Sequence, residues 1–305
     1  MRLLNASGCL DALAAPEVAR TLDAYVRKTV TPLPREGNAP VRIAETELGM
    51  LNAIGLANPG VDAFLEQHLP PLAELGVPLW VSVGGFSLED YVHVAGRLTA
   101  RDEVEALELN LSCPNVDEVP ENVGEVVASV REVTGKPLYA KLSAAVADLG
   151  ATARAAEAAG ADGLSLINTV KGLALDERTL QPVLARGAGG LSGPALRPVA
   201  LAAVHACFRE TRLPIVGMGG VARGRHALEL LAAGASDVAV GTALFADPGA
   251  AARIRSELEA ELGALGFASP DNAVGIAHAS ADDTLDQGSR LTAKKSLHIG
   301  ANMAG

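Results

Sequence analysis

The chain has 305 residues and a formal net charge of −11, and 49% of its residues are hydrophobic, which is enough to bury the core of one large domain. An acidic chain without a lysine or arginine cluster lacks the phosphate-neutralising surface that nucleic-acid binding needs. No apolar run reaches the roughly 18 residues of a membrane span, so neither a nucleic-acid partner nor a membrane anchor is expected.

Short apolar segments alternate with longer amphipathic ones along most of the chain. The short segments predict strands at 2–6, 26–31, 78–83, 106–112, 137–143, 163–169, 213–218 and 237–241. The amphipathic segments predict helices at 61–75, 88–99, 123–133, 151–159, 195–208, 224–233 and 248–262. This alternation is typical of an α/β protein with a parallel sheet. No GxGxxG follows the first strand, so the pattern favours a (β/α)₈ TIM barrel over an open doubly wound sheet.

The predicted barrel is a single domain over residues 1–265. Residues 266–305 are rich in Ala, Asp, Ser and Gly with little periodicity, and we expect a loosely attached or mobile C-terminal extension there. Two connections are unusually long, 32–60 after the second strand and 170–193 after the sixth. Both leave the carboxyl ends of strands, where barrel enzymes carry their active sites, so these loops are expected to be functional.

Polar residues and glycines gather where the predicted strands end. Examples are Ser7, Lys28, Asn110, Lys141 and Asn168. Buried polar groups cost free energy unless they are paired. Because the carboxyl ends of barrel strands meet on one face, these residues predict a lined cavity.

The glycines after the last two strands suggest a phosphate site. Gly219 and Gly220 follow one strand, Gly241 and Thr242 follow the next, and Gly193 precedes a helix. Glycine lets backbone N–H groups approach an anion closely, and a helix N-terminus adds a favourable dipole. The alternative is that these are ordinary turn glycines.

Two strand lysines, Lys28 and Lys141, need an acceptor. One alternative is a salt bridge to a strand carboxylate, for which Glu108 is the main candidate. An electron-rich ligand explains both lysines better, and a flavin fits because a nearby cation stabilises the negative charge of its reduced ring.

Three cysteines at wide spacing predict reduced thiols in a reducing, cytoplasmic compartment and no metal site. Cys207 and Cys9 fit the role of small buried hydrophobes. Cys113 follows a strand beside Asn110 and Asn115, and it is the best candidate for a catalytic base.

The motifs at these positions resemble class 1 dihydroorotate dehydrogenases over residues 3–260. They are NASG at 5–8, KTVTP at 28–32, GMLNAIGLANPG at 49–60, ELNLSCPN at 108–115, KLS at 141–143, LINT at 166–169, GGLSGPALRPVAL at 189–201, GMGG at 217–220 and VGTALF at 240–245. The sequences at 49–60 and 189–201 resemble the NAD-linked class 1B more than the fumarate-reducing class 1A.

The resemblance implies an FMN-dependent oxidation of dihydroorotate to orotate in pyrimidine biosynthesis, with Cys113 as general base. FMN would be contacted by Ser7, Lys28, Thr29, Asn110, Lys141, Ile167, Gly193, Gly219, Gly220, Gly241 and Thr242. The substrate would be contacted by Lys28, Asn52, Ala53, Ile54, Gly55, Leu56, Asn110, Asn115, Asn168 and Thr169. Residues 113–121 would form a lid.

The resemblance also implies a homodimer and a separate subunit that carries FAD and an iron–sulfur cluster and passes electrons to NAD. Two departures stand out: Ser82 occupies a position where class 1B often has Asn, and the family's usual N-terminal hairpin does not precede the first strand. The open alternatives are other flavin-dependent barrel oxidoreductases, such as a tRNA-dihydrouridine synthase or a dihydropyrimidine dehydrogenase-like enzyme.

Overall fold

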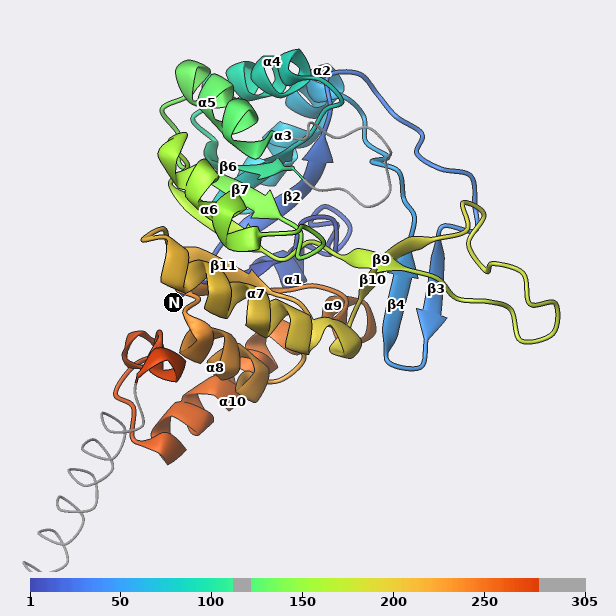
Figure 1. Ribbon diagram of the computed structural model, residues 1–305. Helices are drawn as coiled ribbons and strands as arrows, with labels where there is room; N and C mark the ends of the chain where they lie inside the picture. Colours follow the sequence, from blue (N-terminus) through green and yellow to red (C-terminus); the bar gives the residue numbers. More distant parts are fainter. Residues whose placement is uncertain (112–121, 280–305) are drawn as a thin grey trace, which may run out of the picture.

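A computed structural model describes residues 1–111 and 122–279 of the chain. Eight parallel strands form a barrel in the order β1-β12-β11-β8-β7-β6-β5-β2 (Figure 1). The strands are β1 (Leu3–Asn5), β2 (Tyr25–Val30), β5 (Leu79–Val83), β6 (Val104–Asn110), β7 (Leu138–Leu142), β8 (Gly163–Leu166), β11 (Ile215–Met218) and β12 (Asp237–Val240). The expected (β/α)₈ barrel is confirmed, and every predicted strand segment overlaps one of these strands.

The barrel closes between β1 and β2 largely through one side chain. Leu4 and Ala24 form a single parallel bridge. Beside it, the Asn5 side chain accepts from the Val26 amide at 2.8 Å and donates to the Val26 carbonyl at 2.9 Å. An asparagine amide offers the same donor and acceptor as a peptide group, so Asn5 stands in for a backbone pair at the seam.

Helices pack around the barrel. They are α1 (Pro16–Ala19), α2 (Val61–Ala63), a π-helical turn η1 (Phe64–His68), α3 (Leu69–Ala73), α4 (Leu88–Thr99), α5 (Val123–Val133), α6 (Leu149–Ala158), α7 (Arg197–Glu210), α8 (Gly224–Ala233), α9 (Ala243–Ala246) and α10 (Ala250–Leu265). Side chains of Ser87, Asn122 and Asp148 cap the starts of α4, α5 and α6, which stabilises helix N-termini. None of the helices within the described ranges has the length and apolarity to cross a bilayer.

The helix predicted over 61–75 is interrupted rather than continuous. A π-helical turn separates α2 from α3, and α3 starts at Leu69 followed by Pro70 and Pro71. Proline has no amide hydrogen and is tolerated in the first turn of a helix. The two prolines therefore start a new helical segment instead of continuing the first.

The interior of the barrel is apolar in its middle. Leu4, Val26, Trp80, Ala106, Tyr139, Val216, Met218 and Ala239, from seven of the eight barrel strands, form one buried cluster. Successive strand residues point to opposite faces, so the alternate residues, such as Leu3, Leu107 and Val238, pack under the helices in a separate cluster.

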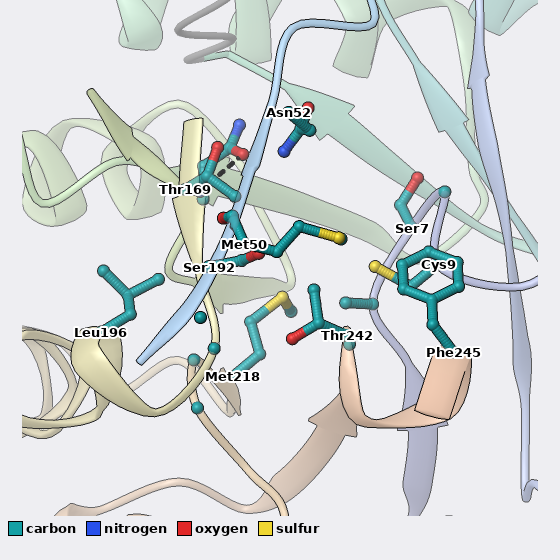
Figure 2. A pocket seen from close by; sticks show the side chains of 18 of the residues that line it. Ser7, Cys9, Met50, Asn52, Thr169, Ser192, Leu196, Met218, Thr242 and Phe245 are labelled. Carbon is teal, nitrogen blue, oxygen red and sulfur yellow. Dashed lines mark hydrogen bonds between the residues drawn. The ribbon is translucent and has the colours of Figure 1, made fainter. Parts of the chain in front are cut away.

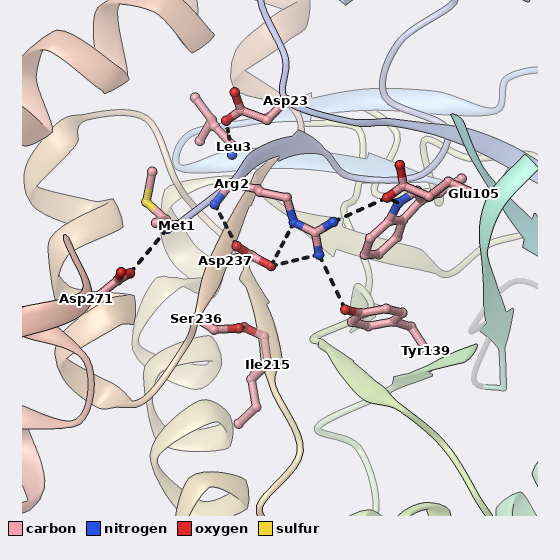
Figure 3. Close-up of polar contacts among 11 residues, drawn as sticks. Met1, Arg2, Leu3, Asp23, Glu105, Tyr139, Ile215, Ser236, Asp237 and Asp271 are labelled. Carbon is pink, nitrogen blue, oxygen red and sulfur yellow. Dashed lines mark hydrogen bonds and ion pairs between the residues drawn. The ribbon is translucent and has the colours of Figure 1, made fainter. Parts of the chain in front are cut away.

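A polar cap covers the amino-terminal end of the barrel (Figure 3). The Arg2 guanidinium donates to Asp237 at 3.1 Å and to Glu105 and Tyr139 at 3.4 Å each. It also lies 4.9 Å from the centre of the Trp80 ring, within the range of cation–π attraction. This end is filled by side chains, so the functional face lies at the opposite end.

Gly163 on β8 makes room for the Tyr139 ring. A Cβ built on Gly163 would lie 2.3 Å from the Tyr139 Cε1 atom. Gly163→Ala is therefore expected to lower the free energy of unfolding by about 1–3 kcal/mol, the usual cost of overpacking a core, as measured by urea denaturation. Gly96→Ala on α4 is the matched control: a Cβ there meets nothing within 4 Å, and a gain of up to about 1 kcal/mol is expected from helix propensity. Equal stability of Gly163→Ala and the unsubstituted chain would contradict this account of the barrel interior.

The two long connections hold a second sheet that the sequence pattern did not predict. Strands β3 (Ile43–Thr46) and β4 (Gly49–Asn52) lie in the first connection, and β9 (Val170–Gly172) and β10 (Gly189–Ser192) in the second. They pair antiparallel in the order β3-β4-β10-β9. Figure 1 shows this sheet projecting from the barrel; we call it the arm. It ties Asn52 to Gly190, residues far apart in the sequence.

The first residues of the expected C-terminal extension are packed on the barrel. Two 3₁₀ turns, η3 (Pro270–Ala273) and η4 (Ile276–His278), lie against α8. The Gly275 amide donates to the Leu231 carbonyl at 2.9 Å. The His278 ring stacks on His205 of α7 with centroids 4.0 Å apart. Within the expected extension, residues 266–279 are thus attached to the barrel by histidine and backbone contacts; residues 280–305 lie outside the described residues.

This docking is expected to weaken in acid. Burial, then the charges of His278 and Arg209, lower the pKa of His205. His205 in the folded state thus binds a proton less readily than in the unfolded state. The stability that comes from docking neutral His205 is therefore fully present above about pH 6.5 and is lost as the pH falls. His278→Phe keeps a stacked ring without a charge. When the pH is lowered from about 7.5 to about 5.5, we expect the free energy of unfolding, measured by urea denaturation, to fall less in this variant than in the unsubstituted chain. An equal fall in both would contradict the role given to the two histidines.

Candidate functional site

A pocket of about 560 Å³ opens at the carboxyl ends of the barrel strands and under the arm. Barrel strands contribute Lys28, Asn110, Lys141 and Met218. The arm contributes Met50, Asn52 and Ser192, the loop after β1 contributes Cys9, and α9 contributes Phe245 (Figure 2). The pocket is therefore built from segments spread over most of the chain.

All residues expected to contact a cofactor line this one pocket. They are Ser7, Lys28, Thr29, Asn110, Lys141, Ile167, Gly193, Gly219, Gly220, Gly241 and Thr242. Their common position is the carboxyl end of a barrel strand or the loop that follows it. The structure thus brings them together at one site.

Most residues expected to contact the substrate line the same pocket, namely Lys28, Asn52, Ile54, Gly55, Leu56, Asn110, Asn168 and Thr169. Ala53 does not. Its side chain is buried with Leu51 and Leu184, its amide donates to the Arg42 carbonyl and its carbonyl accepts from Asn38. All of its polar groups are engaged in the loop, so a substrate contact through Ala53 is not supported.

Two expected site residues, Cys113 and Asn115, lie outside the described residues, as does the expected lid at 113–121. Asn110, the last residue of β6, is described and lines the pocket. Cys113 follows it by three residues in the sequence.

Asn110 is held in a network of hydrogen bonds that fixes its amide. Its Nδ2 donates to the Thr29 hydroxyl at 3.1 Å, and its Oδ1 accepts from Asn168 Nδ2 at 3.1 Å. Thr29 in turn shares a 2.9 Å bond with Ser82, which is fully buried. Ser82, the departure from the class 1B pattern, is thus connected to the pocket through Thr29.

The lysines differ in their surroundings. Lys141 Nζ donates to Glu108 Oε1 at 3.3 Å, with both side chains almost fully buried. The salt-bridge alternative is therefore realised for Lys141, although this lysine also lines the pocket. Lys28 lies beside Gly8, where a built Cβ would be 3.9 Å from its Nζ. Two ammonium groups at one pocket favour an anionic or electron-rich occupant.

The glycines fall into two groups. Gly193, Gly219 and Gly220 have φ angles of 95°, 130° and 71°, which favour glycine. A Cβ on Gly220 would also lie 2.8 Å from the Gly193 carbonyl. Gly241 is different, since its φ is not positive and a Cβ there would make only ordinary contacts with Ala6 and Cys9. The backbone conformation explains the first three glycines, whereas neither the backbone nor the described neighbours require glycine at position 241.

Cys9 was expected to be a packing residue, and it lines the pocket instead. Its sulfur lies 3.6 Å from a Cβ built on Gly241, and Figure 2 shows the Cys9 side chain near Phe245. Burial raises the pKa of its thiol, against the opposing charges of Lys141 and Lys28, so the neutral thiol is favoured. The expectation failed because the loop after β1 turns back over the barrel end. Met50, Met218 and Phe245 were missed as well; the position of Met218 at a strand end was the available signal.

The sequence matches the family model described as Dihydroorotate dehydrogenase over residues 2–262. The chain belongs to the dihydroorotate dehydrogenase family. It is 46% identical over 277 residues to the "Dihydroorotate dehydrogenase B (NAD(+)), catalytic subunit" of Anoxybacillus flavithermus, covering 87% of this chain and 88% of that relative. The protein of the same name from Desulforudis audaxviator is 47% identical over 264 residues, with 84% and 86% covered.

These relatives confirm the expected dihydroorotate dehydrogenase family, its oxidoreductase character and the class 1B interpretation. A solved structure, "Crystal structure of DHODH in complex with ferulenol from Eimeria tenella", has a TM-score of 0.79 at 23% identity and covers 91% of this chain and 85% of that chain. At this identity the likeness bears on the fold alone, and it agrees with the barrel described above.

Proposed function

We propose that this dihydroorotate dehydrogenase family member oxidises dihydroorotate to orotate, with FMN as hydride acceptor, in the de novo synthesis of UMP. The observation that carries the proposal is the pocket at the strand ends, which collects residues from all nine family motifs of a chain 46% identical to a B-type catalytic subunit. The name of the relatives supports dihydroorotate as the substrate, and the residues that line the pocket support FMN as the cofactor.

The residues present fit FMN. The phosphate would lie at Gly193, Gly219 and Gly220, close to the start of α7, as phosphates do at helix N-termini. Ile167 and Met218 offer apolar surface to a flat ring. Asn110, Thr29 and Lys141 offer donors and acceptors to its amide edge. Gly241, which the fold does not require, leaves the space that such a ring needs. Bound FMN supplies the hydride acceptor.

The substrate would be held by asparagines and a lysine. Asn110 and Asn168 bond to each other at 3.1 Å and share the pocket with Asn52. Amide side chains match the alternating donors and acceptors of a dihydropyrimidine ring. Lys28 supplies the cation for the substrate carboxylate. Because Asn168 Oδ1 also accepts from the Thr169 amide at 2.8 Å, its orientation is set before substrate binds, which favours a near-attack arrangement.

Cys113 would take the proton. Its thiolate would remove a proton from the carbon next to the ring carbonyl, while the neighbouring carbon loses hydride from the other face. Asn115 and the lid at 113–121 complete the site in this proposal. The thiols Cys9 and Cys207 are free, in keeping with a reducing compartment such as the cytoplasm.

Partner subunits follow from the relatives' designation as catalytic subunits. We propose a homodimer and a second subunit, with FAD and an iron–sulfur cluster, that passes electrons to NAD. Strand β3 and the residues next to the strands of the arm expose apolar side chains, including Ile43, Val41, Leu48 and Leu173. Where exposed apolar side chains form a patch, that patch is often a protein interface.

The proposed function is tested on the purified chain. Its absorbance spectrum should show an oxidised flavin that is released as FMN on denaturation. Anaerobic dihydroorotate should bleach the flavin band and yield one orotate per flavin. Dihydrouridine and dihydrouracil serve as control substrates for the rival barrel enzymes. A flavin that dihydroorotate leaves oxidised, or a chain that binds no flavin, would refute the proposal.

A further inference from the structure

A buried ion pair lies directly beneath the pocket. Lys141 of β7 and Glu108 of β6 are 3.3 Å apart, with side chains 8% and 2% exposed. Lys141 lines the pocket and Glu108 does not. In the sheet, Lys141 pairs with Asn110, whereas Glu108 pairs with Tyr139, closer to the amino-terminal end. The cation therefore faces the ligand, and the carboxylate lies behind it inside the barrel.

Stability alone does not account for this pair. Desolvating two charges costs several kcal/mol per ion, and apolar residues of similar volume are often as stable or more stable. The neighbouring interior layer is made of such residues, including Leu4, Ala106 and Val216. Ser165, which pairs with Lys141 on β8, has a buried hydroxyl without a hydrogen-bond partner among the described residues. The layer that contains Lys141, Glu108 and Ser165 is thus polar, although burying these groups costs free energy on folding. We take this cost as an indication that the layer has a function.

We propose that Glu108 is a positioning residue that holds the Lys141 ammonium at the pocket floor, offsets part of its charge and thereby lowers the reduction potential of the bound flavin. The inference rests on the proposed function. A lone ammonium beside the ring would favour the reduced, more negative flavin, because charge near the ring tunes its electronics and is little screened in a buried site. The carboxylate behind the ammonium weakens that preference. Electrons can then leave the reduced flavin more readily for the next acceptor.

The test is the midpoint potential of FMN in the holoenzyme carrying Glu108→Gln, measured by anaerobic titration against a reference dye. The amide keeps the volume and an acceptor for Lys141 but removes the negative charge. We expect reduced FMN to gain about tenfold or more in affinity over oxidised FMN, which corresponds to a potential about 30 mV higher for this two-electron couple.

Glu105→Gln is the matched control. Glu105 is on the same strand but at the opposite end of the barrel, where it accepts from Trp80 Nε1 at 3.2 Å and from Arg2. The control is expected to leave the potential unchanged. A shift of the same size in both variants would overturn the proposal, because it would indicate a general loosening of the barrel rather than a local charge effect.

A purely structural role for Glu108 predicts a different result. Glu108→Gln would then be less stable yet keep the potential of the unsubstituted enzyme, and this outcome overturns the proposal. If that variant does not fold, Glu108→Asp replaces it, since a shorter side chain withdraws the charge from Lys141 and should raise the potential by a smaller amount; no rise would refute the inference. An unsubstituted chain that binds no flavin would instead refute the proposed function.

Discussion

Cys113→Ser is expected to lower kcat for dihydroorotate oxidation by about 10²–10⁴-fold near neutral pH, the usual contribution of a general base. A serine hydroxyl is a far weaker acid than a thiol, so the variant holds almost no base form at this pH. The fold and the pocket do not depend on this side chain in our proposal, and FMN should remain bound. Stopped-flow measurement of flavin bleaching isolates the chemical step from later electron transfer.

Cys207→Ala is the control for loss of a thiol. Cys207 is buried on α7, and burial, with the nearby Glu210 and Asp148, raises its pKa to about 12, so it carries no thiolate at neutral pH. We expect its flavin reduction rate to match that of the unsubstituted chain. Bleaching by Cys113→Ser at the unsubstituted rate would show that another group removes the proton.

Lys141→Met is expected to lower the free energy of unfolding by about 3–5 kcal/mol, the cost of leaving a buried charge without its partner. Methionine fills the volume of the lysine stem but leaves the Glu108 carboxylate, 2% exposed, unpaired. Urea denaturation of the flavin-free chain measures the effect and keeps it separate from any loss of flavin affinity.

The double variant Lys141→Met with Glu108→Gln separates the ion pair from the packing. It removes both charges, so most of the lost stability should return, apart from about 1–3 kcal/mol for a poorly bonded buried amide. The difference between the double variant and the sum of the single variants gives the coupling energy. Additive losses would show that the two side chains do not interact as the 3.3 Å distance indicates.

The sequence pattern predicted those elements whose ends are determined by residues close by in the sequence. The predicted bounds of α4 and α5, 88–99 and 123–133, agree with the structure because Ser87 and Asn122 cap the next turn with their own side chains. Strand ends were equally predictable, since the residues that follow a buried strand must either be satisfied or face a cavity. That reasoning placed Asn110, Lys141 and Gly241 at one pocket without coordinates.

Pairing between distant segments was not predictable from such patterns. Strands β4 and β10 are short and separated by more than a hundred residues, yet they pair and close the pocket from above. Neither segment has enough local periodicity to reveal its partner. The same limit hid Cys9, which reaches the pocket because of how its loop folds back, and the docking of His278 on His205.

By itself, the sequence determined the order of strands and helices, the barrel they form, the residues at the strand ends and the family to which the chain belongs. The tertiary structure alone decided that Lys141 pairs with Glu108, that Ala53 packs with Leu51 and Leu184, and that two loops pair to form the arm. The physical reason is range: capping, periodicity and turn chemistry act within a few residues, whereas a salt bridge or a strand pair depends on side chains and backbones that only the completed barrel brings within bonding distance.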